Sequence, residues 1–112
     1  MADITPQTTK RTANDITWAA ASGGGDKFVN TGKELLLVKN GSGGSINVTI
    51  ATPNTVDGLT IADKVIAVAD GKTAVLGPWP PATYSNASDS KKAAVTYSGT
   101  SSVEVAVVKI TP

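Results

Sequence analysis

The chain has 112 residues, of which 40% are hydrophobic and 17% are charged, and its formal net charge is +1 at pH 7. This length predicts a single domain, and the nearly balanced charges exclude a broad basic or acidic field for nucleic acid or a membrane surface. Cysteine and histidine are both absent, which excludes disulfides, Cys nucleophiles, Ser-His-Asp triads and nearly all zinc sites.

The first segment, Met1 to Asn14, is polar and rich in threonine. Because it offers little apolar surface to bury, we expect an extended N-terminal arm over residues 1–14, followed by one β-sandwich domain over residues 15–112. The arm is either a frayed terminus or a segment that orders against a partner. It lacks the apolar core of a signal peptide, and no run in the chain approaches membrane-spanning length, so we expect a protein that is made in a cytoplasm and does not enter a membrane.

Two apolar runs around a loop of glycine, serine and asparagine organise the next part of the chain. The first run, Leu35 to Val38, is continuously apolar, and the second alternates through Ile46, Val48 and Ile50. Alternation with a period of two is typical of a strand with one buried face. Two such runs joined by a glycine-bearing loop predict a β-hairpin between Glu34 and Ala51.

Further short strands bounded by turn residues are expected on both sides of this hairpin. Asp70-Gly71 is the strongest two-residue hairpin signal, since a type I′ turn needs positive φ at both central positions. The expected strands outside the hairpin are Asp15–Ala21, Lys27–Val29, Lys64–Ala69, Lys72–Leu76, Ala93–Ser98 and Val103–Ile110. Roughly eight short strands at such spacing predict an all-β fold, an antiparallel β-sandwich of jelly-roll type.

No residue pattern predicts catalysis, a cofactor or a metal site. Asp57, Asp63 and Asp70 lie in neighbouring loops and could supply oxygen ligands to calcium, but their spacing matches no calcium loop and aspartate is a common turn residue. The carboxylates are scattered along the chain, without the facing pair that a glycosidase needs. The sequence therefore predicts that the protein is not an enzyme.

The aromatic and basic residues are the candidate contact sites. Trp79 stands between Pro78 and Pro80 at the end of a strand, where it either packs on a neighbouring strand or serves as a rigid interface anchor. Together with Trp18, Tyr84 and Tyr97, it could also form a platform for stacking sugars. The pair Lys10-Arg11 is either solvated surface or a docking point for an acidic protein surface.

The overall pattern resembles small β-rich structural proteins of tailed bacteriophages, some of which are capsid decoration, or cement, proteins. The segments that carry this resemblance are Asn30-Thr31-Gly32, Leu37-Val38-Lys39-Asn40-Gly41, Val48-Thr49-Ile50, Thr52-Pro53, Gly58-Leu59, Gly71, Gly77-Pro78-Trp79, Val95-Thr96-Tyr97-Ser98 and Val105-Ala106-Val107. They cover most of residues 27–110. The family supplies no catalytic residues to carry over.

This resemblance implies a virion protein that binds the outside of a phage capsid and cements contacts between major capsid subunits. Its expected partners are the major capsid protein and further copies of itself, as a trimer or dimer, without nucleic acid or membrane. The alternatives are another virion component, such as a head fibre base or a tail protein, or a carbohydrate-binding β-sandwich module. The residues expected to bind partners are Ile4, Pro6, Lys10, Arg11, Trp18, Trp79 and Tyr84.

Overall fold

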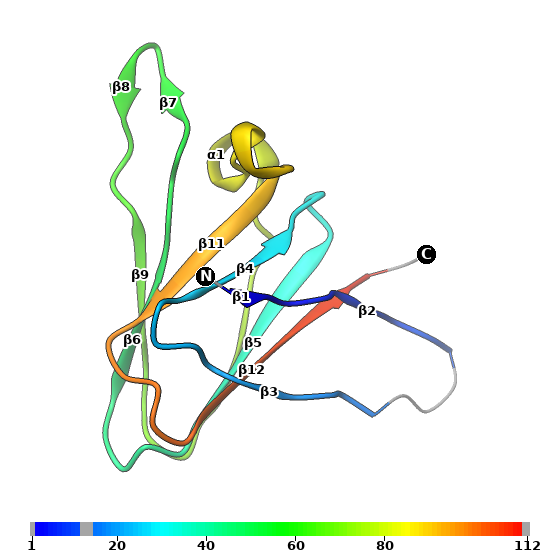
Figure 1. Cartoon of the computed structure of the whole chain (residues 1–112), viewed down its shortest axis with the longest axis vertical. Coiled ribbons are helices and arrows are strands. Elements are labelled where there is room, and N and C mark those ends of the chain that lie inside the picture. The colour runs from blue at the N-terminus through cyan, green and yellow to red at the C-terminus, as the bar shows by residue number, and fades with distance from the viewer. Residues whose placement is uncertain (1, 12–14, 111–112) are drawn as a thin grey trace.

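The computed structural model describes residues 2–11 and 15–110, and its regular secondary structure is almost all β-strand, in two packed sheets and a separate two-stranded sheet, β7-β8 (Figure 1). The strands are β1 (Ala2–Asp3), β2 (Gln7–Thr8), β3 (Ala19–Ala20), β4 (Asp26–Val29), β5 (Glu34–Asn40), β6 (Ile46–Ile50), β7 (Thr55–Val56), β8 (Leu59–Thr60), β9 (Lys64–Val68), β10 (Thr73–Leu76), β11 (Lys92–Tyr97) and β12 (Val103–Lys109). One helical turn, α1 (Pro81–Tyr84), and a 3₁₀ turn, η1 (Ala87–Asp89), lie in the stretch between β10 and β11.

The expected all-β sandwich is confirmed. One sheet has the order β1-β4-β11-β6-β9, and the other has the order β10-β5-β12-β2, with β3 also pairing with β12. The longer strands pair antiparallel, as the sequence predicts, whereas β1 and β2 pair parallel to β4 and β12. Both sheets are therefore mixed at the edge where the N-terminal segment lies.

The predicted hairpin between Glu34 and Ala51 is wrong, because its two strands belong to different sheets. β5 pairs with β10 and β12, and β6 pairs with β9 and β11. The side chain of Asn40 holds the crossing, since its Nδ2 donates hydrogen bonds to Gly44 O (2.8 Å) and to Val68 O (2.9 Å). Alternating residues face inward in a hairpin and in a crossover alike, so the sequence pattern could not separate them.

The turn at Asp70-Gly71 is also a crossover, from β9 in one sheet to β10 in the other. Gly71 has a φ of 76°, while Asp70 is not among the residues with positive φ, so the turn is not type I′. The positive φ angles of a type I′ hairpin turn occur instead at Asp57-Gly58 (50° and 77°), where Val56 pairs with Leu59. The sequence indicated only a turn-rich connection there, because the flanking strands have just two residues each.

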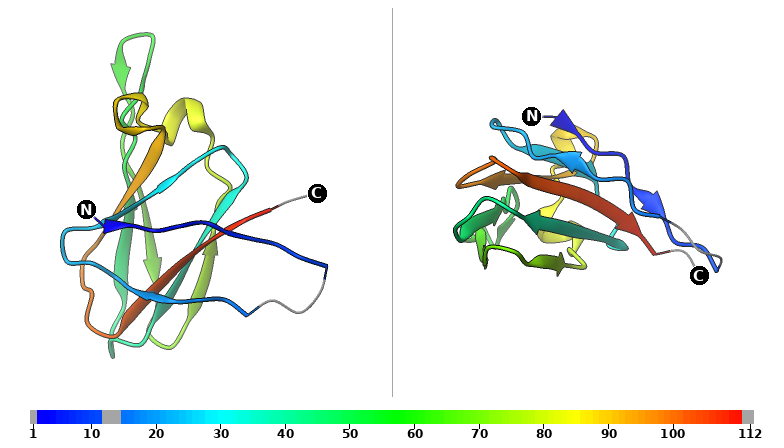
Figure 2. Two further views of the ribbon diagram at one scale, coloured as in Figure 1. Left: turned by 45° about the vertical axis from the view of Figure 1, so that its right-hand side comes forward. Right: turned by 90° about the horizontal axis from the view of Figure 1, so that it is seen from below.

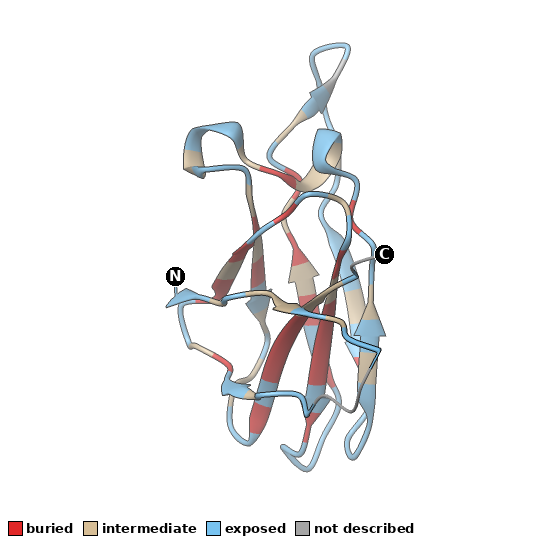
Figure 3. Cartoon of the chain, turned by 90° about the vertical axis from the view of Figure 1, so that its right-hand side faces the viewer, coloured by how far each residue is buried: buried red, intermediate tan, exposed pale blue. Residues whose placement is uncertain are grey.

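The core fills the space between the two sheets, where alternate residues of the long strands face one another. Figure 3 shows the buried residues along the middle strands. The fully buried apolar side chains include Phe28, Leu36, Val38, Val48, Ile50, Val95, Val105 and Val107. Valine and isoleucine dominate because branched side chains suit a pleated surface with one covered face.

The N-terminal segment joins both sheets at one lateral edge of the sandwich (Figure 2). β1 extends the first sheet and β2 extends the second, while the Ile4 backbone N–H donates to Lys27 O (2.8 Å) and the Ile4 side chain packs against the core. The segment is extended, as expected, but in residues 2–9 it is paired with the sandwich. The expected boundary between arm and domain, at residue 14, lies outside the described residues.

Candidate functional site

Trp79 is a core residue, with 5% of its surface exposed. Its ring meets the Tyr84 ring edge-on, with centroids 5.1 Å apart, and its carbonyl oxygen accepts a hydrogen bond from Asn30 Nδ2 (3.0 Å). The indole is therefore packed inward against Tyr84 of α1. A ring covered to this extent presents little surface to a partner, so the packing interpretation of Trp79 fits the structure.

Trp18 lies apart from Trp79, on the outer face of the second sheet. The Nζ of Lys39 is 5.8 Å from the centroid of the Trp18 ring, a cation–π distance. Lys39 lies on β5 opposite Glu104 of β12, and Glu104 pairs with Ala20 of β3. The short strand β3 thus places Trp18 over this face, with the ring half-buried.

The remaining predicted contact residues belong to the N-terminal segment. Ile4 and Pro6 are half-buried, and Lys10 and Arg11 are exposed. The Gln7 side chain fixes the loop that carries the two basic residues, since its Nε2 donates to Thr17 O (2.8 Å) and its Oε1 accepts from the Thr17 N–H (2.9 Å). The Gln7 side-chain amide thus bonds the Thr17 backbone as a neighbouring strand would, and this contact lies close in sequence to the basic pair.

The β7–β8 hairpin projects from one end of the sandwich (Figure 1) and carries an apolar tip that sequence reasoning missed. Leu59 on β8 has 72% of its surface exposed. Thr52 fixes the base of the projection, because its N–H donates to Asp63 Oδ1 (3.0 Å) and its hydroxyl donates to Ile61 O (2.6 Å). Asn54 Nδ2 adds a hydrogen bond to Ser85 O (2.8 Å). The signal that could have found the hairpin is Asp57-Gly58, a turn dipeptide that the sequence analysis did not rank.

A shallow apolar pocket of about 380 Å³, which we call the Ile110 pocket, is lined by Gly32, Lys33, Pro78 and Ile110. It lies where the ladder between β5 and β12 ends, with the Ile110 N–H donating to Lys33 O (2.9 Å). Ile110 is 46% exposed. Gly32 has a φ of 93°, and a Cβ at that position would lie 3.2 Å from Pro81 Cδ. Any side chain at position 32, which lines the pocket, would therefore be strained.

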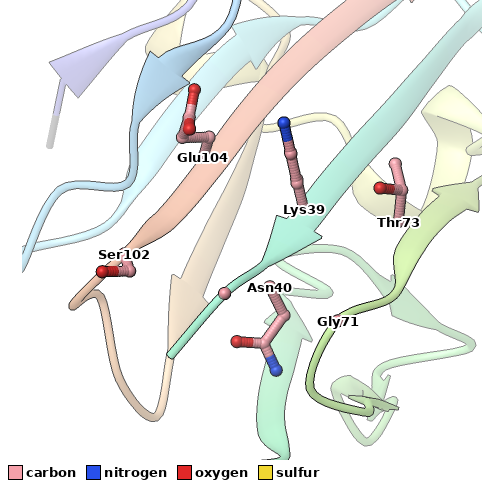
Figure 4. A pocket seen from close by; sticks show the side chains of 7 residues that line it. Lys39, Asn40, Gly71, Thr73, Ser102 and Glu104 are labelled. Atoms are coloured by element: carbon pink, nitrogen blue, oxygen red, sulfur yellow. The ribbon is translucent and has the colours of Figure 1, made fainter. Parts of the chain in front are cut away.

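A polar depression of about 390 Å³, which we call the Lys39 depression, lies on the outer face of the second sheet (Figure 4). Its lining residues are Lys39, Asn40, Gly41, Gly71, Thr73, Ser102 and Glu104. Lys39, Thr73 and Glu104 project from three neighbouring strands. Lys39 and Glu104 face each other in register, yet the ion pairs of the described residues do not join them. The Glu104 carboxylate therefore has no ion-pair partner among the described residues, whereas the Lys39 ammonium lies over the Trp18 ring.

Each pKa shift among the described residues is caused by burial or by a contact within the fold. Burial, then the hydrogen bond to Asp26 Oδ2 (2.7 Å) and the negative charge of Asp26, raise the pKa of Tyr97. The hydrogen bond from Lys92 (2.9 Å) lowers the pKa of Asp3, and the same contact raises the pKa of Lys92. Within residues 2–11 and 15–110, no group of three or more metal-ligating side chains gathers, and no helix is long and apolar enough to cross a membrane.

Comparison of the chain with protein-family models, with curated proteins and with solved structures found no match. The candidate surfaces are consequently judged on their geometry. The β7–β8 hairpin projects from the sandwich, Lys10 and Arg11 are exposed, and the Ile110 pocket and the Lys39 depression are recesses in its surface.

Proposed function

We propose that this chain is a structural virion protein that binds the outer surface of a phage capsid and cements contacts between major capsid subunits. The observation that carries the proposal is a sandwich that presents two separate contact elements, the projecting β7–β8 hairpin, closed at its base by Thr52, and the exposed Lys10-Arg11 pair beyond Gln7. A protein that bridges neighbouring subunits needs contact elements that point in different directions and lose little entropy on binding.

The strand order fits the jelly-roll part of the proposal. In chain order, β3 to β6 alternate between the sheets, and so do β9 to β12; the step from β6 to β9 stays in one sheet. The resulting orders, β3-β12-β5-β10 and β4-β11-β6-β9, place β12 between β3 and β5 and β11 between β4 and β6. Two interleaved Greek keys of this kind make up a jelly roll, a fold found in many capsid proteins.

The Lys10-Arg11 loop is the part of the chain that we expect to meet the shell. Both residues are exposed, and no ion pair within the described part of the chain uses either of them. Two free positive charges at exposed positions would orient the protein on an acidic subunit surface and raise its association rate. The half-buried Ile4 and Pro6 position this loop from the sandwich side.

Cosedimentation with expanded phage capsids tests the proposal. We expect saturable binding with a fixed number of copies per capsid subunit. The double substitution Lys10→Glu/Arg11→Glu should weaken binding at low salt more than Lys64→Glu/Lys72→Glu, which makes the same change in charge at other exposed positions. Absence of the wild-type protein from the capsid pellet would contradict the proposal. An equal loss of capsid binding in the two variants would show that Lys10 and Arg11 do not form the contact.

The carbohydrate-binding alternative has one observation in its favour, the Lys39 depression beside Trp18. A half-buried ring beside polar side chains such as Thr73, Ser102 and Glu104 is the usual composition of a sugar subsite. Because Trp79 is buried, Trp18 is the tryptophan that a polysaccharide would meet. This alternative predicts that a glycan changes Trp18 fluorescence and that Trp18→Phe abolishes the change; an unaltered spectrum across a glycan panel counts against it.

A further inference from the structure

The tip of the β7–β8 hairpin combines one apolar and one acidic side chain. Leu59 is the most exposed large apolar residue among those described, at 72%, and Asp57 is exposed in the adjoining turn. An isolated two-stranded hairpin is only marginally stable in water, but Thr52 joins the two legs of this one at their base, and Asn54 Nδ2 ties it to Ser85 O. An apolar side chain held out in this way suits insertion into a recess on another molecule.

The Ile110 pocket has the complementary composition. Its lining is apolar at Pro78 and Ile110, and Lys33 supplies a positive charge at its rim. With a volume of about 380 Å³, it has ample room for a leucine side chain. Its shape is set by backbone, because the Ile110 N–H is bonded to Lys33 O and Gly32 is crowded against Pro81. The recess is therefore formed before any partner arrives.

We propose that the β7–β8 hairpin of one copy docks in the Ile110 pocket of a second copy, with Leu59 in the recess and Asp57 beside Lys33. Both matches, apolar with apolar and acid with base, are found on the same chain, which favours a second copy over an unrelated partner. The contact joins two different surfaces, so it repeats from head to tail and forms a closed ring or an open chain. This self-association does not require the shell and goes beyond the cementing role.

Pairing of exposed strands is the other way in which copies could join, and the structure disfavours it. At the edge away from the N-terminal segment, the last strands of the two sheets are β9 and β10, which have five and four residues. Lys64 begins β9, Lys72 directly precedes β10, and Pro78 follows it. Short strands with lysine and proline at their ends are typical of edges that resist pairing.

The absence of cysteine from the chain makes directed crosslinking a clean test. Leu59→Cys and Ile110→Cys are made in separate chains, one of them tagged, and the two are mixed under mild oxidation, so that a heterodimer of distinct mass reports an intermolecular contact. The matched control replaces Ile110→Cys with Thr96→Cys, which is exposed on the outer face of the other sheet. We expect the 59–110 heterodimer to exceed the 59–96 heterodimer about tenfold, whereas equal yields would overturn the proposal.

A charge exchange tests the second half of the contact in the same assay. Asp57→Lys in the Leu59→Cys chain, or Lys33→Glu in the Ile110→Cys chain, should lower the yield about threefold, as expected for an exposed ion pair. Mixing the two charge-reversed chains should restore the wild-type yield. If the exchange does not restore the heterodimer yield, Asp57 and Lys33 do not pair in the contact. Because these assays contain no capsid, they can fail while cosedimentation succeeds, and the reverse.

Discussion

The two lateral edges of the sandwich end in different ways. At the closed edge, β1 extends one sheet, β2 and β3 extend the other, and Ile4 packs between them. At the open edge, β9 and β10 end their sheets without a further strand from the described part of the chain. Among the inward side chains of the open edge, Ile66, Ala74 and Leu76 are half-buried and Val68 is buried, while the outward Val65 and Val75 are 55% and 62% exposed.

This difference shows that the N-terminal segment is a structural part of the fold at one edge, while the other edge carries residues that disfavour strand pairing. The closed edge is stabilised by local contacts, including Tyr97 to Asp26, Ile4 to the core, and Gln7 to Thr17. The open edge has lysines and a proline around short strands, which limits pairing with other chains. Substitutions should therefore cost stability at the closed edge and little at the open one.

Tyr97→Phe should have the largest effect. Asp26, beside Ala2 of β1, is 2% exposed, and its Oδ2 accepts hydrogen bonds from the Tyr97 hydroxyl (2.7 Å) and the Ser22 N–H (3.3 Å). Removing the hydroxyl leaves a buried carboxylate with the longer bond, at a cost of about 2 kcal/mol in the free energy of unfolding. Urea denaturation measures this cost. The double substitution Tyr97→Phe/Asp26→Asn is the control, since an additive loss would show that the two groups do not interact.

The same contact gives the unfolding free energy an alkaline dependence. The pKa of folded Tyr97 is raised above the ordinary value of about 10 by burial and by Asp26. The stabilisation is therefore complete below about pH 10 and is lost as the pH rises above it, because the unfolded chain releases the phenolic proton first. Tyr97→Phe should flatten the slope of stability against pH in this window, and an unchanged slope would assign it to another group.

Ile4→Ala should rank next. Ile4 is half-buried against the core and is held by the hydrogen bond from its N–H to Lys27 O. Loss of its outer carbons should cost about 1.5 kcal/mol, less than for a fully buried isoleucine. Thermal and urea unfolding measure the loss. Ile16→Ala, at an exposed position of the same segment (39%), is the matched control and should cost much less; equal costs would mean that Ile4 does not close the edge.

The fold class followed from the sequence because alternation and turn residues are local signals. The strands at Lys64–Val68, Lys92–Tyr97 and Val103–Lys109 lie close to where the pattern placed them. Strand partners did not follow, since the apolar runs of β5 and β6 fit two strands that face each other across the core as well as they fit a hairpin. The pairing of β1 and β2 was also hidden, because two-residue strands of polar residues carry no periodicity.

The candidate site was predictable only in part. Lys10 and Arg11 are exposed, as a polar segment suggests, but Trp79 is enclosed by α1 and Asn30 in a way that its flanking prolines do not reveal. Leu59 gave no signal because a single leucine in a turn-rich connection has no periodic neighbours. The Ile110 pocket combines residues from three distant parts of the chain, which no local pattern can bring together.

Gln7→Ala should have a smaller effect than the two preceding substitutions. The Gln7 amide makes two hydrogen bonds to the Thr17 backbone, but both are exposed to solvent. We expect a cost of about 1 kcal/mol, with faster hydrogen exchange at the Thr17 amide. Gln7→Glu keeps the acceptor for the Thr17 N–H and turns a carboxylate oxygen toward the Thr17 carbonyl, so it should fall between the wild type and Gln7→Ala. Unaltered exchange in both variants would show that the loop is held elsewhere.

Val75→Thr should have the smallest effect and tests the open edge directly. Val75 is 62% exposed on β10, so a similar-sized polar side chain should change the free energy of unfolding by less than about 0.5 kcal/mol. The matched control is Val107→Thr on β12, fully buried in the same sheet, where an unpaired hydroxyl should cost about 1–3 kcal/mol. A cost at Val75 that approaches the cost at Val107, and that grows with protein concentration, would mean that another copy covers β10 in solution. The lysines and proline around this edge would then fail to prevent pairing, and copies would join through β10 in place of the β7–β8 hairpin.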